Sequence, residues 1–90
     1  MYQVRFSERA KKSLGKMDKT QAALILGWIQ KNIVNSINPK QLGKRLNYNL
    51  KFYYRFRIGN YRVIAEINEQ ILTIIIIEVG HRKIIYDHSV

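Results

Sequence analysis

The alternation of side chains over residues 51–58, followed at once by Gly59-Asn60, constrains the fold of this chain more than any other feature. Even-numbered positions carry apolar or aromatic side chains, and odd-numbered positions carry lysine, tyrosine or arginine. A period of two is typical of a β-strand with one apolar face. Gly59-Asn60 fits a two-residue hairpin loop, because glycine accepts the positive φ that such a turn requires. We therefore expect residues 61–67 to return as an antiparallel partner strand.

A two-residue loop also fixes which residues face each other across the hairpin. Ile58 then pairs with Tyr61, and Arg57 pairs with Arg62. Two guanidinium groups directly opposite each other repel, and the pair weakens the sheet. Arginine donates hydrogen bonds in a fork that matches phosphate oxygens, so the same pair is suited to binding a phosphate.

Two amphipathic helices are expected between residues 7 and 34. Ser7 is a suitable N-cap for the first helix, which extends to about Lys16. Asp18, followed three residues later by glutamine, forms a capping-box pattern that opens the second helix. Apolar side chains three and four residues apart give this second helix one buried stripe, which Trp28 widens by packing in the core.

The remaining segments define the fold class. A short alternating strand at residues 2–6 precedes the helices, residues 40–49 are expected to form a loop, and an almost wholly β-branched strand covers residues 71–79. The element order is β-α-α-β-β-β, with a short C-terminal helical turn near residues 84–86. We predict one α+β domain, residues 1–90, in which a twisted antiparallel sheet packs against the helical pair.

The charge of the chain is strongly unbalanced, with sixteen Lys and Arg against six Asp and Glu and a net charge of +10. This excess is larger than solubility requires, and it indicates a polyanionic partner, either nucleic acid or an acidic protein segment. The absence of cysteine excludes a disulfide framework, thiolate chemistry and a Cys-based zinc site. No signal peptide and no apolar run long enough for a membrane span are present, so a cytoplasmic protein without a membrane partner is expected.

Strand order is expected to gather basic residues at the hairpin turn. The strand after Arg62 runs away from that turn and the next strand runs back, so His81 and Arg82 return to the same tip. With Arg55 and Arg57, and with Tyr86 following, these residues are expected to form one exposed, concave basic patch. The other residues expected to bind phosphate or RNA are Lys44, Arg45, Lys51, Tyr53 and Lys83. For Lys44 and Arg45, a solvated loop is the alternative interpretation.

The segments RFRIGNYRVIAEI and ILTIIIIEVGHRKIIY resemble the RelE/ParE superfamily of bacterial toxins. They are similar to the RelE-type pattern R-Y-R-x-G-x-Y-R-x-x-x-E-I followed by G-H-R-x-x-x-Y. The opening strand-helix-helix order and PKQLGKRL are also similar, so the resemblance covers almost the whole chain. It implies a ribosome-dependent endoribonuclease that cuts mRNA in the A site. It also implies an acidic, RelB-like antitoxin bound in a hetero-oligomer, and no cofactor or metal.

The implied reaction is attack of the ribose 2′-OH on the adjacent phosphate, which leaves a 2′,3′-cyclic phosphate and a 5′-OH. It needs a base, cations for the phosphorane and an acid for the leaving oxygen. By resemblance, Arg62 matches the arginine that binds the phosphate. Arg82 matches the arginine that stabilises the transition state or protonates the leaving group, and Tyr86 matches a tyrosine that stacks on a base or donates a proton.

Arg55 is the main departure from the family pattern, because it stands where members carry a lysine proposed as the base. Arginine stays protonated, so Arg55 is better suited to clamping phosphate. Tyr53 likewise stands where a second lysine is sometimes seen. His81 is one candidate base, since imidazole titrates near neutrality, and its alternative role is a hydrogen bond at a strand end. Glu66, which the register places opposite Tyr53, is a second candidate, and its alternative role is a salt bridge to an arginine.

Two other functions stay open. The ParE branch shares the fold and a similar Y-R-V strand, but it inhibits DNA gyrase and has no RNase site. A relative with a decayed site would persist as an antitoxin-binding protein. The joint presence of Arg55, Arg57, Arg62, Arg82 and Tyr86 favours the RNase, because a gyrase inhibitor does not need them together. The missing lysine weakens the case for the RNase. The net charge does not distinguish an RNA partner from an antitoxin partner, because both are polyanionic.

Overall fold

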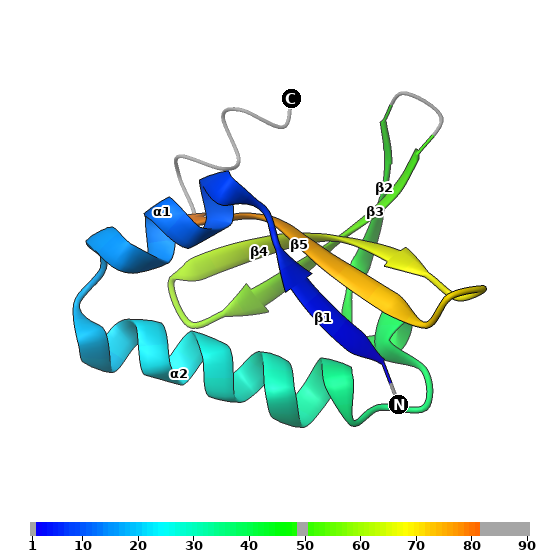
Figure 1. Cartoon of the computed structure of the whole chain (residues 1–90), viewed down its shortest axis with the longest axis horizontal. Coiled ribbons are helices and arrows are strands. Elements are labelled where there is room, and N and C mark those ends of the chain that lie inside the picture. The colour runs from blue at the N-terminus through cyan, green and yellow to red at the C-terminus, as the bar shows by residue number, and fades with distance from the viewer. Residues whose placement is uncertain (1, 49–50, 82–90) are drawn as a thin grey trace.

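The computed structural model describes residues 2–48 and 51–81, and it confirms the predicted α+β class. Two helices cover one face of a five-stranded sheet (Figure 1). The helical elements are α1 (Glu8–Lys16), α2 (Lys19–Ile29), the π-helical turn η1 (Gln30–Val34) and the 3-10 turn η2 (Pro39–Leu42). The strands are β1 (Gln3–Phe6), β2 (Lys44–Tyr48), β3 (Lys51–Ile58), β4 (Tyr61–Asn68) and β5 (Thr73–His81). Within the described residues no helix is long and apolar enough to cross a membrane.

The sheet is mixed, and not wholly antiparallel as we predicted. Its strand order is β1-β5-β4-β3-β2, and β1 runs parallel to β5 while the other neighbouring pairs are antiparallel. The helices carry the chain from β1 to the opposite edge of the sheet, where β2 begins (Figure 1). Antiparallel connections then return to β5, and β5 pairs with β1 in the same direction.

The central hairpin has the predicted turn and register. Gly59 adopts a φ of +61°, in the left-handed region that glycine enters without a Cβ penalty. Ile58 pairs with Tyr61, and Arg57 pairs with Arg62. The two arginines therefore stand directly opposite each other, as the two-residue loop requires.

Residues 40–49 contain a strand, where we had expected a loop. β2 pairs with β3 from Lys44 opposite Arg55 to Tyr48 opposite Lys51. It is an edge strand rich in charge, a composition that protects sheet edges from unwanted pairing. Its residues do not alternate as those of a half-buried strand do, so the sequence pattern did not reveal it. Hydrogen bonding to the open edge of β3 decides its conformation.

The last strand is displaced relative to its predicted span. We expected residues 71–79, and β5 runs over Thr73–His81. Residues 69–72 form the turn that precedes it, in which Leu72 has a φ of +49°. The helical turn predicted near residues 84–86 lies outside the described residues.

Both predicted helix caps are confirmed. The Ser7 hydroxyl accepts a hydrogen bond from the backbone N–H of Ala10. The Asp18 carboxylate accepts from the backbone N–H groups of Thr20 and Gln21. These bonds satisfy N–H groups that a helix leaves free in its first turn.

The core lies between the helices and the sheet. Phe56 is fully buried, and its ring centroid lies 5.9 Å from that of Trp28, which confirms the packing role of that tryptophan. On its other side the Phe56 ring faces Gly43, where an added Cβ would lie 2.8 Å from a ring carbon. The backbone can therefore pass from η2 into β2 at this distance only because residue 43 lacks a side chain. Further fully buried side chains are Ile25, Ile29, Ile33, Val63, Ile74, Ile76 and Val79.

We predict opposite stability changes for two glycine-to-alanine substitutions. Gly43→Ala should lower the melting temperature, because the new Cβ overpacks a buried ring at a cost of about 1–3 kcal/mol. Gly27→Ala lies in the last turn of α2, which continues into η1, and no other part of the chain lies within 4 Å of the new Cβ. It should therefore stabilise the protein through helix propensity, by up to about 1 kcal/mol, and raise the melting temperature. Thermal unfolding followed by circular dichroism measures both. Equal shifts would contradict the packing assigned to Gly43.

Candidate functional site

The two faces of the β3–β4 hairpin differ in chemistry because side chains alternate along each strand. Tyr54, Phe56 and Ile58 on β3 point toward the helices and are buried. The odd-numbered side chains of β3 and their cross-strand partners point to the opposite face. We call this second surface of the hairpin and β2 the cation face. The basic residues there whose side chains the structure describes are Lys44, Arg55, Arg57 and Arg62.

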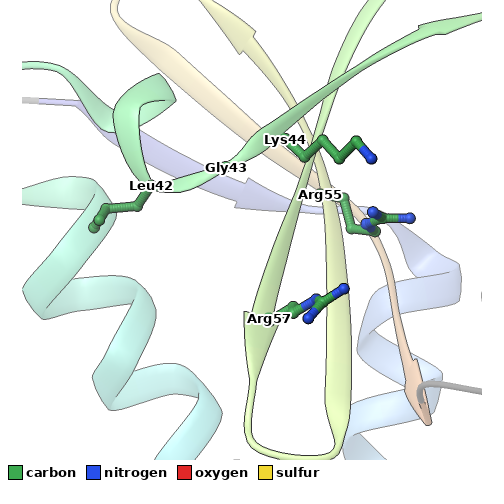
Figure 2. Close-up of a pocket in the computed structure, with 5 residues that line it drawn as sticks. All are labelled: Leu42, Gly43, Lys44, Arg55 and Arg57. Carbon is green, nitrogen blue, oxygen red and sulfur yellow. The ribbon is translucent and has the colours of Figure 1, made fainter.

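Three neighbouring strands supply the cation face. Lys44 on β2 stands directly opposite Arg55 on β3, one step along the same surface from the Arg57–Arg62 pair. Figure 2 shows Lys44, Arg55 and Arg57 extending to the same side of their strands. With Leu42 and Gly43 they line an open cavity of about 360 Å³.

The cations of this cavity are available to an anion. Within residues 2–48 and 51–81, no carboxylate lies within ion-pair distance of Lys44, Arg55 or Arg57. Arg57 and Lys44 are exposed, and Arg55 is half-buried. Grouped cations without a local carboxylate raise the positive potential of a cavity, and this attracts phosphate.

Arg62 belongs to the same face but is not exposed as we expected. Its relative accessibility is 2%, whereas Arg57 opposite it is exposed. Arg62 lies on an inner strand, with β3 on one side and β5 on the other. Arg62 therefore does not present its guanidinium group to solvent as Arg57 does.

Glu66 lies where the hairpin register predicts. It pairs with Tyr53, on the same side of the sheet as Arg55, and it is half-buried. We weighed a salt bridge to an arginine as its alternative role. In the described part of the chain, the carboxylates with a cation within 4.0 Å are those of Glu8, Glu69 and Glu78. The described contacts thus leave the Glu66 carboxylate free for another role.

His81 reaches the expected tip of the sheet but not the cation face. It is the last residue of β5 and pairs with Tyr61, and the two rings meet edge to face with centroids 5.8 Å apart. Tyr61 packs against the core on the helix side. His81 therefore points to the side of the sheet opposite Arg55 and Arg57. Our expectation of one shared patch was wrong for His81, because strand order locates the end of a strand but not the face of each side chain.

The other predicted site residues do not lie together on one face of the sheet. Tyr53 lies on the cation face, whereas Arg45 pairs with Tyr54 and so alternates to the helix side of the edge strand. Lys51 is the first residue of β3. The remaining three, Arg82, Lys83 and Tyr86, lie outside the described residues.

The segment that leads into the site is anchored by Lys40, a role that the sequence did not reveal. The Lys40 ammonium donates a hydrogen bond to the Glu69 carboxylate in the β4–β5 turn, and it lies 5.6 Å from the centroid of the Tyr54 ring. The bond to Glu69 raises the pKa of Lys40. Together with the packing of Gly43 on Phe56, this anchor sets where β2 begins and hence where Lys44 stands.

Comparison with known proteins gives consistent matches. A family model described as the ParE toxin of type II toxin–antitoxin systems, parDE, matches residues 4–86. Toxin RelG of Mycobacterium tuberculosis is 31% identical over 85 residues, 94% of this chain and 95% of the relative. Toxin RelE3 of Methanocaldococcus jannaschii is 44% identical over 54 residues, 60% of this chain and 59% of the relative. The crystal structure of the toxin–antitoxin complex RelBE2 from Mycobacterium tuberculosis aligns with a TM-score of 0.78 and 30% identity, over 90% of this chain and 98% of that chain.

We predict that Arg57→Thr raises the melting temperature of the isolated protein. The change removes a like-charged partner opposite Arg62. Because cross-strand pairs contribute about 0.2–1 kcal/mol, we expect a shift of roughly 1–8 °C. Arg5→Thr is the matched control, because Arg5 is an exposed strand arginine that faces Ile75. It lowers the net charge equally but relieves no like-charged pair. A lower melting temperature for Arg57→Thr would show that Arg57 stabilises the sheet.

Proposed function

Because this chain belongs to the ParE toxin family of type II toxin–antitoxin systems, within the RelE/ParE superfamily, we propose that it is a RelE-type endoribonuclease that cleaves mRNA in the ribosomal A site. The observation that carries this proposal is the cation face. Lys44, Arg55 and Arg57 line one cavity. Arg62 of β4 stands directly opposite Arg57 on the same face of the sheet. Inhibition of a protein target does not require basic residues gathered around one open cavity.

The cation face supports the reaction through electrostatics. When the 2′-oxygen attacks, the phosphorane carries more negative charge on its equatorial oxygens than the phosphodiester did. Guanidinium groups placed around the cavity would stabilise that added charge more than the charge of the ground state. Arg55 and Arg57 would donate to these oxygens directly, and Arg62, which stands opposite Arg57, would bind phosphate as the family pattern implies. Arg82 and Tyr86 are proposed to take part as the family pattern implies.

We further propose an acidic, RelB-like antitoxin as the partner that holds the protein inactive. The structural relative from Mycobacterium tuberculosis was solved as a toxin–antitoxin complex. The net charge of +10 favours a polyanionic partner, whether the antitoxin or the mRNA held by the ribosome. Cover of the cation face by an acidic segment would block substrate and neutralise the face at the same time.

Inhibition of DNA gyrase is the second candidate, and one observation favours it. The family model that matches residues 4–86 carries the description of the ParE toxin of parDE systems. The full-length match to RelG and the cation face favour the RNase instead. A catalytically decayed, antitoxin-binding relative is the third candidate, because Arg55 replaces the lysine of the family pattern.

Primer extension on an mRNA in a purified translation system tests the proposal. We expect cuts that need ribosomes, occur in frame and fall within the A-site codon. Intact mRNA at high protein concentration would overturn the RNase assignment, and a gyrase supercoiling assay would then separate the second candidate from the third.

We predict that Arg55→Ala lowers the single-turnover cleavage rate by about 10² to 10³-fold, the usual cost of removing one donor to a developing oxyanion. The fold should persist, because Arg55 is only half-buried and points away from the core between the sheet and the helices. Lys12→Ala, on the exposed surface of α1, removes one positive charge far from the cavity and should change the rate less than threefold. Equal losses in both variants would mean that net charge, and not the cavity, drives activity.

A further inference from the structure

The cation face contains few groups that can carry a proton between substrate oxygens. Its arginines remain protonated at any physiological pH and serve as donors only. His81 points to the other side of the sheet. The structure describes two carboxylates on the cation side of β4 and β5, those of Glu66 and Glu78. Glu78 lies 3.5 Å from Arg9 of α1, whereas no described cation lies within ion-pair distance of Glu66. Among the residues whose side chains the structure describes, Lys44 supplies an amine on the cation face.

These two groups flank Arg55. Lys44 stands directly opposite Arg55 across β2 and β3, and such partners have Cβ atoms about 5 Å apart. Glu66 pairs with Tyr53 across β3 and β4, which makes it a diagonal neighbour of Arg55 at about 7–8 Å. A phosphate held by Arg55 would therefore have an ammonium group on its β2 side and a carboxylate on its β4 side. That carboxylate is displaced by two residues along the strand and lies at the margin of the cavity that Lys44, Arg55 and Arg57 line.

In-line cleavage of RNA needs this kind of placement. The attacking 2′-oxygen and the leaving 5′-oxygen lie on opposite sides of phosphorus, so the base and the acid must approach from opposite sides. We propose that Glu66 is the general base and Lys44 the general acid of this protein. The proposal rests on the proposed RNase function, and it explains how the site works although Arg55 replaces the family lysine.

The proton transfers balance within this pair. A Glu66 carboxylate oxygen takes the proton of the 2′-OH as the 2′-oxygen forms its bond to phosphorus. The bond from phosphorus to the 5′-oxygen breaks with its electron pair on oxygen, and the Lys44 ammonium donates a proton to that oxygen. The products are a 2′,3′-cyclic phosphate and a 5′-OH. Glu66 is then protonated and Lys44 neutral, and exchange with water restores both.

The experiment compares two synthetic mRNAs on programmed ribosomes under single-turnover conditions. One has the normal scissile linkage, and the other has sulfur in place of the leaving 5′-oxygen. A thiolate leaves without protonation, so loss of the acid should matter only for the oxygen substrate. The variants are Glu66→Gln and Lys44→Gln, with Glu8→Gln and Lys31→Gln as exposed controls outside the site.

On the oxygen substrate we expect both site variants to be about 10² to 10⁴-fold slower than wild type, with the controls unchanged. On the sulfur substrate Lys44→Gln should recover to within about tenfold of wild type, while Glu66→Gln should stay slow. Melting temperatures establish that each variant is folded. If Glu66→Gln does not fold, Glu66→Asp keeps a carboxylate, set back by one methylene, and should cleave both substrates slowly.

Each other outcome has a definite meaning. Wild-type rates for Glu66→Gln or Lys44→Gln on the oxygen substrate would overturn the corresponding role. If Lys44→Gln cleaves both the oxygen and the sulfur substrate slowly, Lys44 binds the phosphate and its role as the acid is overturned. Recovery of Glu66→Gln on the sulfur substrate would overturn its role as the base. No cleavage of either mRNA by wild-type protein would instead reject the proposed RNase function.

Discussion

The period-two alternation of β3 is the constraint on which the rest of the structure depends. One set of its side chains packs against the helices, and the other set is thereby directed to the opposite face. A shift of one residue in the pairing would expose Phe56 and bury Arg55 and Arg57 in the core, so the register is strongly determined. The packing that stabilises the fold thus also fixes the orientation of the cations.

The edge strand completes this arrangement from outside the hairpin. Gly43 packs on Phe56, and the Lys40–Glu69 pair ties the preceding turn to the far end of β4. Both contacts are structural, yet they determine that Lys44 stands opposite Arg55. Core packing and site geometry are therefore coupled through Phe56, whose ring also contacts Trp28.

Electrostatics act against the fold at this face. Arg57 and Arg62 oppose each other, Lys44 opposes Arg55, and Arg62 is buried. Repulsion of this kind destabilises the isolated protein and is relieved when an anion binds. A basic face of this kind suits the two partners proposed above, antitoxin and RNA, because both are polyanionic. The same charges would strengthen binding to either.

The sequence by itself determined the α+β class, the two helix caps, the hairpin turn and the Arg57–Arg62 pairing. These features depend on local rules: capping chemistry, the φ of Gly59 and a period of two. They required no knowledge of distant contacts. The position of Glu66 opposite Tyr53 followed from the same short-range register.

Only the tertiary structure decided the strand at Lys44–Tyr48, the parallel pairing of β1 with β5, the burial of Arg62 and the side of the sheet that His81 occupies. Each depends on which strands become neighbours and on how β5 is aligned with β4, including the irregularity between Ile64 and Ala65. The pattern within a strand does not reveal which distant strand becomes its neighbour or in which direction the two run. Local patterns could therefore predict the hairpin, whereas the neighbours of that hairpin completed the site.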